Sequence, residues 1–411
     1  MAWWRILAVG VVLILAVAPP VAGQEVAAQD DQQDRPSFGM SMSGGDASMA
    51  VAIGLSSMDR YADLLGFDEH QRDAAMMLHE AYLEDYKLAA DAIAQGMEDL
   101  EDESKLTRDR DEFRSNLGRL WRGMLDQQIK LDERLLGDLE TLAALPEDDD
   151  SFARVERARR RELAHAISRV NGAWVDLFDV AERTGVRDEP GVSDILREYE
   201  TQIDAAHRPL IEAQLAVMRG GIELMEEPYA VARERSRGEA YQAWAEANTE
   251  KLADADANAK ATNERFSRQI ARALPEDEAT AWTNEFNRRA WPVVYRVSDA
   301  QRVLDAAAGL EDLTGEQREQ LDALRAGYER DAASINQRWA KAIDTHQAGA
   351  GNPWPGGGES ADVERARADR EELDERLIER VRGLLTPEQA ERLPDTGGVD
   401  ADEVVRELGG R

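Results

Sequence analysis

The stretch Leu313-Thr314-Gly315-Glu316-Gln317 opens the C-terminal part of the chain, and Leu385-Thr386-Pro387-Glu388-Gln389 repeats it 72 residues later. Both stretches predict the start of a helix. A threonine at the N-cap can accept a hydrogen bond from the backbone N–H three residues on, and a glutamine there can reach back to the N-cap N–H. A third copy, Phe67-Asp68-Glu69-His70-Gln71, lies nearer the N-terminus. We therefore assign as helix-capping residues Asp68, Gln71, Thr314, Gln317, Thr386 and Gln389.

An apolar pattern follows these caps and occurs three times. Steps of 3, 4, 4, 3 and 4 residues separate its positions, which is the spacing of one helix face. The three copies are Ala75, Leu78, Tyr82, Tyr86, Ala89 and Ile93; Val192, Ile195, Tyr199, Ile203, Ala206 and Leu210; and Leu321, Leu324, Tyr328, Ala332, Ile335 and Trp339. Because three of only 8 tyrosines share one register, we expect Tyr82, Tyr199 and Tyr328 to be equivalent. Each should be buried against the second helix of its own unit, with the hydroxyl near the edge.

The repeated pattern predicts an all-α fold of three tandem long-helix hairpins. Connecting helices over residues 151–183 and 276–308 would join the hairpins in an extended or cradle-like arrangement. The predicted segments are a signal peptide (1–23), a disordered linker (24–56), hairpin unit 1 (57–162), hairpin unit 2 (163–292), an LTxxQ-like hairpin unit 3 (293–395) and a polar tail (396–411).

Several breaks are expected within these units. The densely charged run over residues 98–111 predicts a solvated turn or a frayed helix in the first unit. Pro209 and Pro292 are expected to kink their helices, and Pro228 to mark the turn of the second unit. The Gly- and Pro-rich loop of the third unit should expose Trp354.

The N-terminus has the features of a secretory signal peptide. One Arg precedes an apolar run over residues 6–18, which Pro19-Pro20 and two small residues follow. A membrane anchor is the less favoured alternative, because the run is shorter than the roughly 20 apolar residues that cross a bilayer. The chain has no cysteine for acylation or disulfides. We expect a periplasmic or secreted protein with no stable membrane insertion after signal cleavage.

The charge balance limits the possible partners. The 50 basic residues are outnumbered by 83 acidic ones, which gives a formal net charge of -33. Removing residues 1–23 takes away one Arg and makes this charge one unit more negative. Such a surface repels nucleic acid and favours basic partners or bound cations.

The largest basic cluster is interpreted in two ways. Five arginines lie between Arg154 and Arg161. They could contact a partner or an anionic surface, or they could pair within the chain with acids such as Asp148, Asp149 and Asp150. The intramolecular alternative is favoured, because such arrangements usually form solvated ion-pair networks.

Metal and catalytic motifs are weak. Residues 254–258 copy the first ligand positions of a calcium loop, but Ala259 and Arg265 replace the required Gly and Glu, so we reject this site. The histidines lack the i, i+4 spacing of a helical zinc site, and a weak site at His70 or His79 with nearby carboxylates is left open. No phosphate loop, nucleophile elbow or CxxC motif is present. We therefore expect no enzyme activity and no cofactor, and we assign no catalytic, cofactor-binding or metal-ligating residue.

The two pentapeptides of the third unit resemble the motif of the LTxxQ family, which includes Spy/CpxP-like periplasmic chaperones and related metal-sensing proteins. The resemblance covers about residues 298–395. It implies helix-end roles for Thr314, Gln317, Thr386 and Gln389, and a thin, cradle-shaped homodimer that holds unfolded proteins without ATP. The first two units lack a full Leu-Thr pair, and the chain has three predicted hairpins where the family has one.

Together these features favour an exported, ATP-independent chaperone-like or envelope stress protein that binds non-native or basic proteins. Two alternatives stay open. One is a periplasmic metal-binding or sensing protein, and the other is a structural helical spacer of the cell envelope.

Overall fold

The computed structural model describes residues 52–107, 109–146, 149–168, 170–349 and 360–395. Every regular element in these ranges is a helix, so the predicted all-α fold class is confirmed. The signal peptide, most of the linker, the loop with Trp354 and the polar tail lie outside the described residues. None of the helices in these ranges combines the length and the hydropathy that crossing a bilayer takes.

The chain divides by its internal contacts into two compact units, each made of two sequence segments. Unit 1 contains residues up to Ile167 together with Ile203–Ala255, and unit 2 contains Ser168–Gln202 together with residues from Asp256 on. The boundaries fall inside two long helices, α7 (Pro190–Glu226) and α9 (Glu239–Ala273). The three-unit division and the tandem arrangement of hairpins stay predictions.

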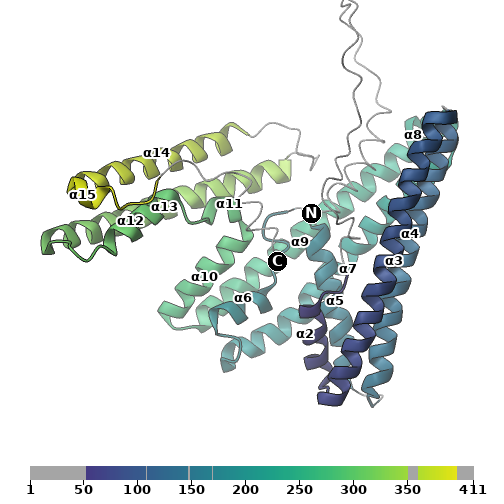
Figure 1. Cartoon of the computed structure of the whole chain (residues 1–411), viewed down its shortest axis with the longest axis horizontal. Coiled ribbons are helices and arrows are strands. Elements are labelled where there is room, and N and C mark those ends of the chain that lie inside the picture. The colour runs from purple at the N-terminus through teal and green to yellow at the C-terminus, as the bar shows by residue number, and fades with distance from the viewer. Residues whose placement is uncertain (1–51, 108, 147–148, 169, 350–359, 396–411) are drawn as a thin grey trace, which may run out of the picture. The chain divides into compact units, whose positions relative to one another are not determined.

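Unit 1 is built on a long helical hairpin. Its helices are α2 (Leu55–Leu65), α3 (Glu69–Thr107), α4 (Arg110–Ala143), α5 (Ser151–Ile167) and α8 (Tyr229–Arg237), with parts of α7 and α9. Helices α3 and α4 pack along each other, and α2 packs on α3 and α5 (Figure 1).

The core of unit 1 lies where α2, α3, α4 and α5 meet. The buried side chains there include Tyr61, Tyr82, Leu135, Leu139 and Val155. Burying a large apolar side chain contributes about 1.5–3 kcal/mol, so this cluster supplies much of the stability of the unit. A second cluster, around Leu117 and Ile222, joins the half of the hairpin near its turn to α7.

Glycine permits a close contact between α7 and α9 in unit 1. A Cβ atom at Gly220 of α7 would overlap the ring of Trp244 of α9. The ring could not take its place beside α7 if residue 220 carried a side chain.

Unit 2 contains a second long hairpin. Its helices are α6 (Leu177–Thr184), α10 (Glu276–Ala290), α11 (Pro292–Tyr295), α12 (Asp299–Ala308), α13 (Gly315–Gly349), α14 (Ala361–Leu384) and α15 (Pro387–Ala390). Helices α13 and α14 pack along each other, and α12 packs against both (Figure 1). Val303, Leu304, Tyr328, Leu377 and Val381 belong to the core between these helices.

Three helix boundaries differ from the sequence prediction. The charged run of the first unit stays helical as far as Thr107, because Leu100 packs against α4 while Glu98, Asp99 and Asp102 are exposed. The connecting helix predicted over 151–183 is two helices, α5 and α6, and Gly172 between them has a φ of 85°. The predicted kink at Pro292 is a break, because α10 ends at Ala290 and α11 starts at the proline.

The other two prolines lie differently in the second predicted unit. Helix α7 continues through Pro209 as a single element. Pro228 follows the end of α7 and forms the N-cap of α8, and Gly238 separates α8 from α9. The second long helix of this predicted hairpin therefore starts with a short separate segment.

Candidate functional site

The residues assigned as caps form reciprocal hydrogen bonds. The backbone N–H of Gln317 donates to Thr314 Oγ1 at 3.2 Å, and the N–H of Thr314 donates to Gln317 Oε1 at 2.9 Å. Thr386 and Gln389 repeat this pair at 3.3 and 3.0 Å. These bonds satisfy backbone donors that a helix start otherwise leaves without partners.

Asp68 and Gln71 form the same pair at the start of α3. The N–H of Gln71 donates to Asp68 Oδ1 at 2.9 Å, and the N–H of Asp68 donates to Gln71 Oε1 at 3.1 Å. In all three boxes the glutamine carbonyl is used for capping. Its amide is therefore available to donate elsewhere.

Those amides join the two ends of each hairpin. Gln71 Nε2 donates to the carbonyl of Leu142 at 3.1 Å, and Gln317 Nε2 donates to the carbonyl of Leu384 at 2.9 Å. Gln317 Nε2 also donates to Gln389 Oε1 at 3.0 Å. Each glutamine thus caps one helix and holds the end of the partner helix beside it, a second role that the sequence did not predict.

The tyrosine of the first pattern lies in a buried polar cluster of unit 1. The Tyr82 hydroxyl donates to Asp132 Oδ1 of α4 at 2.8 Å and accepts from the N–H of Ile53 at 3.0 Å. Arg159 of α5 forms an ion pair with the same Asp132. Burial, together with the nearby carboxylate of Asp132, raises the pKa of Tyr82 well above its ordinary value, so the phenol stays protonated.

The tyrosine of the third pattern has the same kinds of partner in unit 2. The Tyr328 hydroxyl donates to Asp374 Oδ1 of α14 at 2.7 Å and lies 2.8 Å from Ser298 Oγ, the N-cap of α12. Arg370 donates to the phenol oxygen at 2.7 Å and to Asp374 at 3.1 Å. Burial raises the pKa of Tyr328 to about 12, although Arg370 opposes the rise.

The tyrosine of the second pattern has an uncharged partner. The Tyr199 hydroxyl donates to Asn263 Oδ1 of α9 at 2.9 Å. Asn263 in turn donates to the carbonyls of Gly172 and Ala173 at 2.8 and 3.1 Å. Both side chains are fully buried. An amide can satisfy this phenol without bringing a charge into the core.

The three tyrosines are therefore buried against a second helix, as their shared register predicts. The expectation that the hydroxyls lie near an edge is wrong for Tyr199, which is fully buried. Each hydroxyl also contacts the chain where it leads into a short helix, near Ile53, Val175 or Ser298. The polar partners Asp132 and Asp374 were missed, although each directly follows a Leu in the second helix of its hairpin.

The arginine cluster pairs with acids of its own unit. Arg159 contacts Asp132 and Glu162, and Arg160 Nε donates to Asp204 of α7 at 2.6 Å. Asp150, one of the partners expected from the sequence, lies 3.7 Å from Arg157, and Asp148 lies outside the described residues. Burial would raise the pKa of Asp204, but hydrogen bonds from Arg160 and Arg208 outweigh it and hold that pKa below its ordinary value. The intramolecular interpretation therefore fits these contacts.

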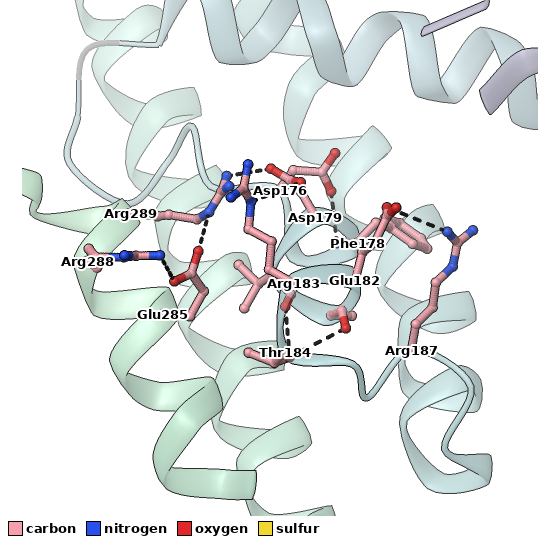
Figure 2. Close-up of polar contacts among 12 residues, drawn as sticks. Asp176, Phe178, Asp179, Glu182, Arg183, Thr184, Arg187, Glu285, Arg288 and Arg289 are labelled. Atoms are coloured by element: carbon pink, nitrogen blue, oxygen red, sulfur yellow. Dashed lines mark hydrogen bonds and ion pairs between the residues drawn. The ribbon is translucent and has the colours of Figure 1, made fainter. Parts of the chain in front are cut away.

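A second ion-pair network joins α6 and α10 within unit 2, and Figure 2 shows it. Arg289 lies between Asp179 Oδ2, at 2.5 Å, and Glu285 Oε1, at 3.0 Å. Burial would raise the pKa of Glu285, but hydrogen bonds from Arg289 and Arg288 hold it below its ordinary value. Both carboxylates are thus matched by guanidinium groups, which indicates a structural network.

The histidines considered for a metal site are placed differently from one another. His70 is exposed, whereas His79 is 2% exposed and its Nε2 lies 2.7 Å from the carbonyl oxygen of Ile53. The sequence resembling a calcium loop lies inside α9. Within the part of the chain that the structure describes, no three His, Asp or Glu side chains group in a way that could hold a metal ion.

Comparisons with protein-family models, with curated proteins and with solved structures give no match to this chain. The LTxxQ resemblance therefore rests on the two pentapeptides and their spacing.

Proposed function

We propose that this protein is an exported, ATP-independent chaperone-like or envelope stress protein that binds non-native proteins. The observation that carries the proposal is a set of large apolar side chains on the surface of an acidic all-α protein. They are Leu55, Met77, Leu83, Leu88, Tyr229, Val231, Val293 and Val297, and their exposed fractions run from 40% to 71%.

Such a surface suits weak, reversible binding of unfolded chains. Apolar side chains gain about 25 cal/mol for each Å² that a bound segment removes from water. The exposed positions are scattered over several helices, so a client could be held by a few of them at a time. This favours many low-affinity contacts over one tight site.

The charge of the chain predicts which clients bind first. A net charge of -33 attracts basic segments and repels acidic ones. This attraction acts over roughly 30 Å at about 10 mM salt and over roughly 8 Å at about 150 mM salt. Client choice should therefore depend on ionic strength.

The buried polar groups support a binding role over a catalytic one. The polar groups of the tyrosine clusters and of the arginine networks find their partners inside each unit. The side-chain amides of Gln71 and Gln317, here called the glutamine clasps, hold the hairpin ends together. We propose that these groups keep the hairpins straight and their outer surfaces fixed. The proposed activity requires neither a nucleotide nor a cofactor.

Aggregation of a chemically unfolded client tests this function. The chain lacking residues 1–23 is mixed with a basic or an acidic client at about 10 mM and about 150 mM salt, and light scattering follows aggregation. We expect suppression of both clients, with a preference for the basic one that shrinks at the higher salt. Equal scattering with and without the protein, for both clients, would exclude the chaperone function. A zinc or copper titration would then separate a metal-binding protein from a spacer.

A further inference from the structure

Helix α3 has two apolar stripes, and only one is buried in unit 1. The buried stripe contains Ala75, Tyr82, Tyr86 and Ala89 and faces the core. The second stripe, here called the outer stripe, consists of Ala74, Met77, Ala81, Leu88 and Ala92. Ala74 is half-buried and the other four are exposed.

The members of the outer stripe form one apolar seam along α3. Its members follow one another by 3, 4, 7 and 4 residues, steps that keep side chains on one face of an α-helix. Met77 and Leu88 are 71% and 61% exposed, and they lie three turns apart on one face. Large apolar side chains this exposed at seam positions indicate a face that a partner helix covers.

Acidic side chains line one side of the outer stripe. Helical spacing places Asp73, Glu80, Glu84 and Asp91 on the adjoining arc of α3, and all four are exposed. Among the described residues, no salt bridge engages any of these four carboxylates. Lys87 is the only Lys or Arg between Asp73 and Asp91 in the sequence. The seam therefore has a strongly negative flank.

We propose that the outer stripe of α3 is a docking surface for a basic amphipathic helical segment of a partner protein. The apolar side of such a segment would cover Met77 and Leu88, and its Lys or Arg side chains would reach Glu80 and Glu84. A second copy of this chain fits poorly, because its net charge of -33 would bring acid against acid. The inference rests on the proposed function and gives its preference for basic clients a location.

A designed peptide probes the surface directly. The basic peptide has about three heptads, with Leu at the core positions and Lys beside them. An acidic peptide replaces every Lys by Glu, and a scrambled basic peptide keeps the composition but loses the seam. Fluorescence anisotropy measures the binding of each labelled peptide to the full chain lacking residues 1–23. We expect the basic amphipathic peptide to bind at least about tenfold more tightly than either control.

The apolar contribution is tested with a matched pair of variants. Met77→Gln combined with Leu88→Gln removes the two large seam residues while keeping side chains that favour helix. Ala94→Gln changes another exposed apolar residue of the same helix, which lies off the stripe. We expect the double variant to bind the basic peptide at least about tenfold more weakly, and Ala94→Gln to bind like the parent. Circular dichroism checks that both remain folded.

The charge contribution has its own control. Glu80→Gln combined with Glu84→Gln removes two flank charges, and Glu319→Gln combined with Glu329→Gln removes two exposed charges from α13. The first pair should weaken peptide binding several-fold more than the second at about 10 mM salt. The difference should shrink at about 150 mM salt.

The outcomes separate this surface from the proposed function. Unchanged peptide binding by the Met77 and Leu88 variant would overturn the docking surface, even if client aggregation is still suppressed. Equal binding of the acidic peptide would also overturn it. Sedimentation showing a parent dimer that this variant dissociates would assign the stripe to a second copy instead. The parent could bind the peptide, and the Met77 and Leu88 variant lose that binding, although the parent suppresses no aggregation. That result would keep the docking surface and exclude the chaperone function.

Discussion

Tyr82 and Tyr199 hold the same place in the repeated helix pattern but bind different partners. Tyr82 donates to the carboxylate of Asp132, which Arg159 neutralises, whereas Tyr199 donates to the amide of Asn263. The comparison teaches that one buried phenol can be satisfied in two ways. A buried carboxylate requires a matching cation, while an amide requires only nearby backbone carbonyls.

Tyr328 shows which of the two solutions recurs. Its partners Asp374 and Arg370 reproduce the carboxylate and guanidinium found around Tyr82, although both lie on one helix, α14. Around Tyr82 the cation comes from α5 instead. The cluster of phenol, carboxylate and guanidinium therefore links three helices in unit 1 and two in this part of unit 2.

The largest effect on stability is expected when Tyr199, whose partner is the uncharged Asn263, loses its ring. Tyr199→Ala should lower the free energy of unfolding by about 4 kcal/mol, because it leaves a cavity at a fully buried site. Tyr229→Ala is the control, since that ring is 40% exposed and its loss should cost little. Urea unfolding of the full chain, followed by circular dichroism, measures both. Equal midpoints for the two variants would contradict the buried register.

The charged cluster should be most sensitive to loss of its cation. Arg159→Met leaves Asp132 in a mostly buried site without its partner and should cost about 3 kcal/mol. Combining it with Asp132→Asn should recover part of that loss, because no buried charge then remains. Arg134→Met breaks the exposed pair with Asp85 and should cost less than about 1 kcal/mol. A double variant less stable than Arg159→Met would refute this account.

Removing only the hydroxyl sharpens the comparison. Tyr199→Phe leaves Asn263 Oδ1 without its donor in a buried site and should cost about 1–2 kcal/mol. Tyr328→Phe should cost less, because Asp374 keeps its hydrogen bond from Arg370. Urea midpoints of the two variants give the order. The reverse order would mean that the charged cluster depends on its phenol more than on its ion pair.

The glutamine clasps are expected to have a smaller effect. Thr314→Ala removes one capping acceptor and should cost about 1 kcal/mol. From the capping box alone Gln317→Ala would cost less, but it also removes the bonds to Leu384 and Gln389, so we expect at least an equal loss. Asp188→Ala is the control, since the second pattern has Gly185 at its cap position and no box there. If urea unfolding showed that Asp188→Ala costs as much stability as the other two variants, the clasp would be contradicted.

The smallest effect concerns pH and the arginine network of unit 1. The pKa of Asp204 is lowered in the folded protein, so the unfolded chain takes up the proton first as the pH falls. The stability that its ion pairs supply is therefore present above the ordinary value of 3.8 and is lost as the pH falls through the lower folded pKa. Thermal unfolding between pH 5 and about pH 2 should show a shallower decline in Asp204→Asn than in the parent. Asn263→Ala is the contrast, and its cost should not vary across this range.

Local features of the fold were predictable because their partners lie close in sequence. Asp68 and Gln71 are three residues apart, so their capping bonds follow from the pentapeptide. The extent of α3 was not predictable in this way. Its charged end stays helical because Leu100 meets residues of α4, and a window of the sequence around position 100 does not contain that contact.

The candidate binding surface shows the same division. The outer stripe can be read from the spacing of Met77, Ala81 and Leu88, but so can the buried stripe of the same helix. Both patterns are apolar and helical, and periodicity does not say which one the rest of the chain covers. The exposed fractions of Met77 and Leu88 decide it.

The sequence by itself determined the all-α fold class, the three capping boxes and the shared register of Tyr82, Tyr199 and Tyr328, because each depends on helical spacing and on bonds within one turn. Only the tertiary structure decided that Asp132 and Arg159 meet one phenol while Asn263 meets another, and that Gln317 reaches the end of α14. Those partners lie tens of residues away along the chain, and packing between helices brings them within hydrogen-bond distance.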